Sequence, residues 1–495
     1  MRKLPALLIS LSLPVAAFAA APTTIDLPQM GEPADLVMSP TEEAQIAVEV
    51  VHELYQADYV IDDYELSDYI TSLGWRLAAA GTPTPPHFRF FPLPDPDINA
   101  AAFPGGVIVV NAGTILEADS ESELAAVMAH EEAHVTQRHI AREINDTKNA
   151  DLATWAAMLA AIIAGAANPN LVIGALTLGQ GINYNRQISY TRANEMEADR
   201  IGIRTLANAG FDPNAMAGFF AKLDQKTRLY GSGLPEILQN HPVNTTRIAE
   251  ANARAAEYPK RRYTDSPDFM FMRARTRVLL AQQPNSAAEF FRAQLENNNK
   301  AADIRYGYAF ALSQMNRYEQ AMQALTPVVE AYPKQVQVQL LHANILGGLG
   351  HTKESLDEYQ QITKAYPNYA PAILETAQAQ IDAGQNEAAR QTLLAHLSAL
   401  SNQVDTSKLL AEAASANGNM SEAQFQTANY YYERGDARGA IEQLDAALRL
   451  ASLTPDDRAR LLAKRREIIG SLPNGQLPSR QGFYKALGQN GGSQP

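Results

Sequence analysis

The sequence of 495 residues contains no cysteine. Disulfide bonds and a lipid anchor on cysteine are therefore excluded, and a zinc site in this chain has to use histidine and carboxylate ligands. Basic residues are also scarce, because 41 lysines and arginines stand against 54 acidic residues and give a formal net charge of -13. This balance argues against nucleic acid or an anionic membrane surface as the main partner.

Hydrophobic runs long enough to cross a membrane are lacking as well. The apolar run from Leu4 to Phe18 is too short to span a bilayer comfortably. It follows Arg2 and Lys3 and leads into small residues that end at Ala21, which is the pattern of a cleavable signal peptide over residues 1–21. An uncleaved anchor is the alternative. We expect an exported protein, with the periplasm as its compartment.

A second apolar stretch, over residues 152–177, is rich in alanine and is broken by Asn168-Pro-Asn170. Each half is shorter than a membrane span, and the break would leave backbone groups without hydrogen-bond partners in lipid. We interpret this stretch as a buried helical hairpin or an apolar flap. A peripheral membrane contact is the alternative.

The pattern His130-Glu131-x-x-His134 is the feature around which the rest of the chain is interpreted. Four residues of an α-helix turn through about 400°, so the two histidines lie on one face, where their ring nitrogens can share a metal ion. Glu131 lies at the edge of that face, where its carboxylate can take a proton from water at the metal. Ser120 and Glu123 form a capping box that predicts the start of this helix. A solvated helix with two histidines is the alternative.

The elements before this motif are predicted to be two helices and a small sheet. Capping and proline signals predict helices over residues 40–57 and 64–80. Aromatic and β-branched residues then predict short strands over 88–91 and 107–110. An edge strand beside a metal site can bind a substrate backbone through its unpaired N–H and C=O groups. A strand that is fully paired inside the sheet is the alternative.

A later helix carries Glu195, Glu197 and Asp199. A catalytic zinc ion usually takes three protein ligands and leaves a fourth position for water, so one carboxylate is needed beside the two histidines. Asp199 lies one turn after Glu195 on the same face, where it can accept the free N–H of a ligand histidine. Glu197 lies about 200° around the helix from Glu195, and we expect it to be solvated. The spacing alone does not select Glu195 from the other carboxylates.

Three further residues lie in sequence patterns that are less specific for a metal site. His241 precedes Pro242 in a loop, where it can cap the metal in a resting state or stabilise the transition state. A surface-loop histidine is the alternative. Arg247, in the following helix, is a candidate for support of the lid or the transition state. His139 lies about 140° around a continuous helix from His134, so we expect it to face away from the metal and to be structural.

From about residue 266 the sequence repeats with a period of 34 residues, which is the tetratricopeptide period. Small residues, glycines and Tyr-Pro pairs recur at this spacing. The positions are Ala309, Ala343, Ala377 and Ala411; Gly350, Gly384 and Gly418; Ser355, Ala389 and Ala423; and Tyr332-Pro333 with Tyr366-Pro367. A shift of 17 residues near Ala428 suggests that one helix belongs to two units, and residues 457–470 are predicted to be a capping helix. The array binds other proteins or packs on the preceding domain, and the two roles are compatible.

These features together resemble the zinc endopeptidase family that includes the CAAX prenyl protease, and within it the periplasmic β-barrel assembly-enhancing proteases. The resemblance rests on the signal peptide, His130-Glu131-x-x-His134, Glu195-x-x-Ala198-Asp199, the His241-Pro242 loop and the repeats. It implies that His130, His134 and Glu195 bind one zinc ion and that Glu131 is the catalytic base. It also implies a regulatory or transition-state role for His241. Membrane-embedded relatives carry transmembrane helices around this core, and here only the 152–177 stretch could correspond to them.

We therefore expect a mainly α-helical protein. A signal peptide (1–21) is followed by a gluzincin-type zinc metalloprotease domain with a small β-sheet (22–262), a tetratricopeptide α-solenoid (263–470) and a flexible tail (471–495). The expected function is that of a periplasmic zinc endopeptidase that assists the assembly of outer-membrane proteins and degrades misassembled ones. Expected partners are unfolded or stalled outer-membrane proteins and, through the solenoid, the β-barrel assembly machinery. The alternative is a non-proteolytic chaperone or adaptor with a latent zinc site.

Overall fold

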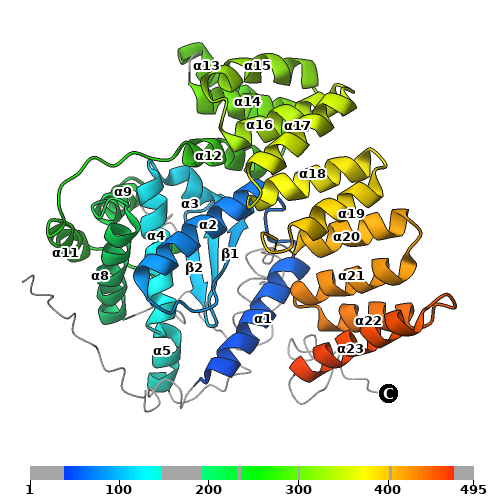
Figure 1. The fold of residues 1–495 in the computed structure, drawn as a ribbon. Coiled ribbons are helices and arrows are strands. Elements are labelled where there is room, and N and C mark those ends of the chain that lie inside the picture. The colour runs from blue at the N-terminus through cyan, green and yellow to red at the C-terminus, as the bar shows by residue number, and fades with distance from the viewer. Residues whose placement is uncertain (1–37, 148–190, 231–235, 299–300, 401–403, 473–495) are drawn as a thin grey trace, which may run out of the picture.

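The computed structural model describes residues 38–147, 191–230, 236–298, 301–400 and 404–472. The predicted signal peptide, the 152–177 stretch and nearly all of the predicted tail lie outside these ranges. The described chain is mainly helical with one three-stranded sheet, which confirms the predicted fold class (Figure 1). None of its helices is long and apolar enough to traverse a lipid bilayer, within the ranges that the structure describes.

The N-terminal region, residues 38–255, contains the sheet and the helices around it. Its elements are α1 (Pro40–Gln56), α2 (Tyr64–Gly81), β1 (Arg89–Leu93), β2 (Ala100–Phe103), β3 (Val107–Asn111), α3 (Ala112–Glu117), α4 (Glu121–Thr136), α5 (His139–Thr147), α8 (Arg192–Ala209), α9 (Ala215–Tyr230), α10 (Glu236–Asn240) and α11 (Thr245–Ala255). The capping box predicted for α1 is present, since the Ser39 side chain accepts from the Glu42 amide and Glu42 accepts from the Ser39 amide.

The sheet is buried on both faces because helices cover each of them. β3 is the central strand, parallel to β1 and antiparallel to β2. Successive side chains of a strand point to opposite faces, so Val107 and Val109 pack in one apolar cluster with α1, whereas Ile108 and Val110 pack in another with α2 and α4. The β2–β3 turn passes close under α1, where a side chain at Gly105 would collide with the Glu43 carbonyl oxygen.

The helical array, residues 267–471, consists of antiparallel helices that pack in pairs. Its elements are α12 (Pro267–Leu280), α13 (Pro284–Asn297), α14 (Ala302–Gln314), α15 (Tyr318–Ala331), α16 (Val336–Gly348), α17 (Thr352–Ala365), α18 (Ala370–Asp382), α19 (Asn386–Ala395), α20 (Asp405–Ala416), α21 (Met420–Glu433), α22 (Ala437–Ala447) and α23 (Pro455–Ser471). Helix α21 packs against both α20 and α22, as the 17-residue shift suggested.

The turn between paired helices repeats one backbone conformation. Gly350, Gly384 and Gly418 each have a positive φ, between 74° and 83°. Asn316 occupies the corresponding position 34 residues before Gly350 and has a φ of 56°. Asparagine is one of the few residues other than glycine that adopts this conformation readily. The left-handed turn therefore occurs in one more repeat unit, on the N-terminal side, than the glycines of the sequence indicate.

The array arcs around one side of the N-terminal region and contacts it near both of its ends (Figure 1). At the start of the array, Arg275 of α12 makes ion pairs with Asp63 and Glu65 at the beginning of α2. Near its end, the Arg434 guanidinium lies 4.3 Å above the Tyr55 ring of α1. The two parts of the chain are thus held together by buried or half-buried charged groups as well as by apolar packing.

Candidate metal centre

The motif helix α4 lies in the interior of the N-terminal region. The Ser120 side chain accepts a hydrogen bond from the Glu123 amide, so the helix begins where the capping signal predicted. His130, Glu131 and His134 are 5%, 1% and 2% exposed, respectively. Burial lowers the pKa of His134 well below its usual value, which keeps the ring neutral, as a metal ligand must be. The alternative of a solvated helix is thereby excluded.

Helix α8 crosses α4 closely and brings the carboxylates to the histidines. The Thr191 side chain caps α8 by accepting from the Asn194 amide, so Glu195 lies in its first turn. Gly202 lies at this crossing, where a Cβ atom would be in ordinary contact, at 3.4 Å, with the Ala129 and His130 backbone. This crossing explains how Glu195, more than 60 residues after the motif in sequence, comes to lie beside it.

Four side chains converge on one point with the separations that a metal ion requires. One ligand atom from each of His130, His134, Glu195 and His241 lies within 4.8 Å of the others. Neighbouring donor atoms are 3.0 Å apart for the Nε2 atoms of His130 and His134, 3.4 Å for His134 Nε2 and Glu195 Oε1, and 3.3 Å for His130 Nε2 and His241 Nδ1. A tetrahedron with zinc-ligand distances of 2.0–2.1 Å has edges of about 3.3–3.4 Å, so the donor set fits zinc in both chemistry and spacing.

His241 occupies the fourth corner of this tetrahedron. It follows the last residue of α10, and it is 5% exposed, so it is not a surface-loop histidine. Its Nδ1 lies 2.8 Å from Glu195 Oε1, and its Nε2 lies 3.6 Å from Glu131 Oε1. Burial disfavours the charged ring, but the carboxylates of Glu195 and Glu131 outweigh it and raise the pKa of His241 to about 9. The side chain therefore closes the site in this conformation.

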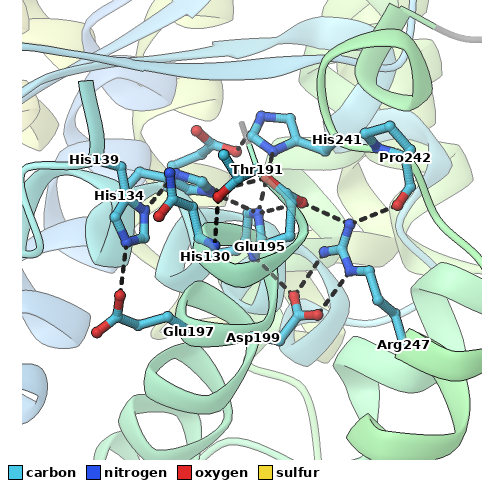
Figure 2. A network of polar contacts seen from close by, with 12 residues as sticks. His130, His134, His139, Thr191, Glu195, Glu197, Asp199, His241, Pro242 and Arg247 are labelled. Atoms are coloured by element: carbon cyan, nitrogen blue, oxygen red, sulfur yellow. Dashed lines mark hydrogen bonds and ion pairs between the residues drawn. The ribbon is translucent and has the colours of Figure 1, made fainter. Parts of the chain in front are cut away.

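Asp199 and Arg247 contact His130 and Glu195 and lie below them in the view of Figure 2. Asp199 Oδ1 lies 3.0 Å from His130 Nδ1, where a carboxylate can fix the ring orientation. Arg247 donates from Nε and Nη2 to the two Asp199 oxygens at 2.8 and 2.7 Å, and its Nη1 lies 2.6 Å from Glu195 Oε2. It also donates to the Pro242 carbonyl at 3.0 Å, so one guanidinium joins the carboxylates to the His241 loop.

Glu131 is a buried carboxylate beside the cluster. Neither of its oxygens has a hydrogen-bond partner in the part of the chain that the structure describes. Burial raises its pKa, and the nearby His241 and His130 rings partly oppose this shift. The Ala102 backbone lies close enough to lower the pKa slightly, although no hydrogen bond of ordinary geometry forms. A carboxylate with a raised pKa and free lone pairs is suited to take a proton from water.

The space next to Glu131 offers two surfaces to a substrate. β2 is an edge strand of the sheet, within the described ranges, and packs against α4. On another side, an apolar pocket reaches the His130, Glu131 and His241 side chains. The apolar residues that line it are Ala126, Val127, Met216, Phe219, Phe220, Leu223, Ile237 and Val243. An extended peptide could pair with β2 and place an apolar side chain in this pocket.

His139 and Glu197 contradict the sequence prediction. The expectation that His139 faces away assumed a continuous helix, but α4 ends at Thr136 and Arg138 adopts a left-handed φ of 50° before α5 begins. This break turns the buried His139 ring back, so that its Nδ1 lies 2.9 Å from His134 Nδ1. Glu197 is not simply solvated either, because its Oε2 lies 3.2 Å from His139 Nε2 and accepts from Arg142. Neither glycine nor proline marks the break in the sequence.

Comparison with known proteins shows two family matches in the chain. Peptidase family M48 matches residues 65–255, and a tetratricopeptide repeat family matches residues 278–345. The "Beta-barrel assembly-enhancing protease" of Escherichia coli K12 is 32% identical over 463 residues, which cover 92% of this chain and 94% of that protein. A "Putative beta-barrel assembly-enhancing protease" of Vibrio cholerae is 38% identical over 62% of this chain and 64% of its own length. A "Mitochondrial metalloendopeptidase OMA1" of Arabidopsis thaliana is 35% identical over 32% of this chain and 30% of its own length.

Proposed function

This chain belongs to peptidase family M48 and, within it, to the β-barrel assembly-enhancing proteases, and from this membership we propose which of its residues cleave a peptide bond and in which substrates. The chain is a zinc metalloendopeptidase. We propose that His130, His134 and Glu195 hold the zinc ion, that Asp199 and Arg247 hold these ligands in place, and that Glu131 is the catalytic base. The convergence of the four donor atoms beside a buried carboxylate carries this proposal.

The chemistry follows from the placement of Glu131. A bound zinc ion acidifies water and polarises the carbonyl group of the peptide bond. The Glu131 carboxylate takes a proton from the attacking water and returns it to the nitrogen of the leaving amine. Its raised pKa suits both tasks, since Glu131 is then a stronger base toward water than an ordinary carboxylate and can still return the proton to the amine. If His241 is a lid, it has to leave its position before a substrate carbonyl can approach.

The substrates that we propose are unfolded or stalled β-barrel proteins of the outer membrane, met in the periplasm. Two features support this. An edge strand next to the catalytic base suits an extended, β-forming chain, and the adjoining apolar pocket suits the apolar side chains of such a chain. The relatives named for β-barrel assembly cover nearly the whole sequence. We propose that the helical array contacts the assembly machinery, since repeat arrays of this kind present surfaces for other proteins.

Metal removal tests the proposed function. We expect the purified chain to contain one zinc ion, to cleave an unfolded casein-type substrate slowly, and to lose this activity in a strong chelator. Re-addition of Zn²⁺ should restore it, because the ligands come from helices that the surrounding apolar core holds in place. Elemental analysis and a cleavage assay on the same samples measure both quantities. Cleavage that persists in metal-free protein would contradict the proposal.

A second candidate function is a chaperone or adaptor whose zinc site is latent. The position of His241 favours it, because this ring fills the site that a water molecule needs. If His241 is a lid, replacing it by alanine should raise basal cleavage several-fold, since the population of open sites increases. The assay is cleavage of casein by wild type and His241→Ala at equal zinc content. A fall in cleavage would instead assign His241 to the transition state.

A further inference from the structure

The contact between His134 and His139 has a defined hydrogen-bond direction. His134 Nε2 faces the ligand cluster, 3.0 Å from His130 Nε2, so a metal bound there uses the Nε2 lone pair. A neutral imidazole has one proton, which must then be on Nδ1. This N–H points at His139 Nδ1, 2.9 Å away. His139 can accept at that atom only if its own proton is on Nε2.

Glu197 satisfies this condition for His139. Its Oε2 lies 3.2 Å from His139 Nε2, and an ionised carboxylate can only accept a hydrogen bond. Arg142 donates to the same oxygen at 2.8 Å, and this positively charged partner favours the ionised carboxylate. The contacts of His134 with His139 and of His139 with Glu197 are therefore both consistent with a single tautomer of each ring.

Helix α8 thus provides a carboxylate for each histidine of the motif, from two positions that are two residues apart. Asp199 approaches His130 directly, whereas Glu197 reaches His134 through the interposed His139 ring (Figure 2). The left-handed turn at Arg138 makes this possible. Its side chain donates to Glu43 of α1 at 2.9 Å and to the Met38 carbonyl, so packing against α1 stabilises an otherwise unfavourable backbone.

We propose that His139 and Glu197 are positioning residues for the metal centre, which fix the tautomer and the ring orientation of His134 and so raise its affinity for zinc. This inference rests on the proposed role of His134 as a ligand. It assigns a task to two residues that touch neither substrate nor metal.

The test is the zinc affinity of the full-length protein, measured by competition with a chelator of known affinity. We expect His139→Leu to weaken zinc binding by about 10- to 100-fold, the usual effect of removing the partner of a ligand histidine. His139→Asn should recover most of this loss, because its side-chain oxygen can accept the His134 N–H at a similar position. His342→Leu is the matched control, since His342 also pairs with a glutamate, Glu358, but lies in the array. Its zinc affinity should equal that of the wild type.

A second measurement distinguishes a positioning role of His139 from a general contribution to the stability of the fold. Two-dimensional ¹H–¹⁵N spectra of the histidine rings should show His134 protonated at Nδ1 in the wild type and His139→Asn, and a mixture of tautomers in metal-free His139→Leu. If His139→Leu does not fold, Glu197→Leu decides, because this side chain is 26% exposed and its loss should weaken zinc binding in the same direction.

Equal zinc affinity of wild type and the leucine variants would overturn the inference, as would an asparagine variant no better than the leucine variant. A wild-type protein that binds no zinc would instead refute the proposed function.

Discussion

Replacing Glu131 by glutamine is expected to lower the rate of peptide-bond cleavage by about 10²- to 10⁴-fold, the range that a general base usually contributes. Glutamine has nearly the same shape but cannot accept a proton from water. Zinc content should be unchanged, because Glu131 is not among the four residues whose donor atoms converge. The measurement is single-turnover cleavage of an unfolded substrate, together with elemental analysis of both proteins.

The next residue of the same helix provides a matched control. Glu132 is also a buried glutamate, 4% exposed, and burial raises its pKa well above the usual value. Burial disfavours its charged form, and glutamine should replace it with little change in shape. We expect Glu132→Gln to keep cleavage within a few-fold of the wild type. Equal activity of Glu131→Gln and the wild type would show that another group activates water.

Local sequence patterns predicted the bounds of helices and strands more accurately than the way in which these elements pack together. The capping signals of α1 and α4 depend on residues three apart, so the sequence determined the starts of both helices. The pair of histidines four residues apart needed only helical geometry to share one face. Two of the three strands followed from β-branched and aromatic runs, and the structure extends each by one or two residues. The alanine-rich strand β2 was not predicted.

The positions of some side chains depend on contacts between residues far apart in the sequence, and local patterns do not predict these positions. Glu195 was selected by resemblance, because the contact of α8 with α4 joins residues far apart in the sequence and no short pattern encodes it. The direction of the His139 side chain was predicted wrongly for a related reason. Its ring turns toward the metal centre only because contacts with α1 hold Arg138 in a left-handed conformation. Residues whose position depends on such tertiary contacts are the ones that sequence analysis missed.

Replacing Arg275 by methionine is expected to lower the free energy of unfolding by about 3–5 kcal/mol, the usual cost of leaving buried charges without their partner. Arg275 is 7% exposed and lies between α12 and α2, where its guanidinium contacts Asp63 at 2.8 Å and Glu65 at 2.6 Å. It also donates to the Tyr306 hydroxyl at 3.1 Å. Methionine fills a similar volume but leaves two buried carboxylates uncompensated. Arg390→Met, at an exposed arginine of the array, should change stability by less than about 0.5 kcal/mol.

The cause of this loss can be tested by removing the carboxylate charges as well. The triple variant Asp63→Asn, Glu65→Gln, Arg275→Met should recover most of the lost stability, since asparagine still caps α2 and the two carboxylates paired with Arg275 are gone. Lowering the pH should also reduce the loss of stability in Arg275→Met. Burial raises the pKa of Glu65 in the folded protein, so the folded state binds a proton more readily than the unfolded state, and the deficit of Arg275→Met should be smaller at about pH 5 than at about pH 8. Chemical unfolding followed by circular dichroism measures all of these variants. A deficit that neither the triple variant nor acid reduces would mean that Arg275 stabilises the junction through its contact with the Phe310 ring rather than through its ion pairs.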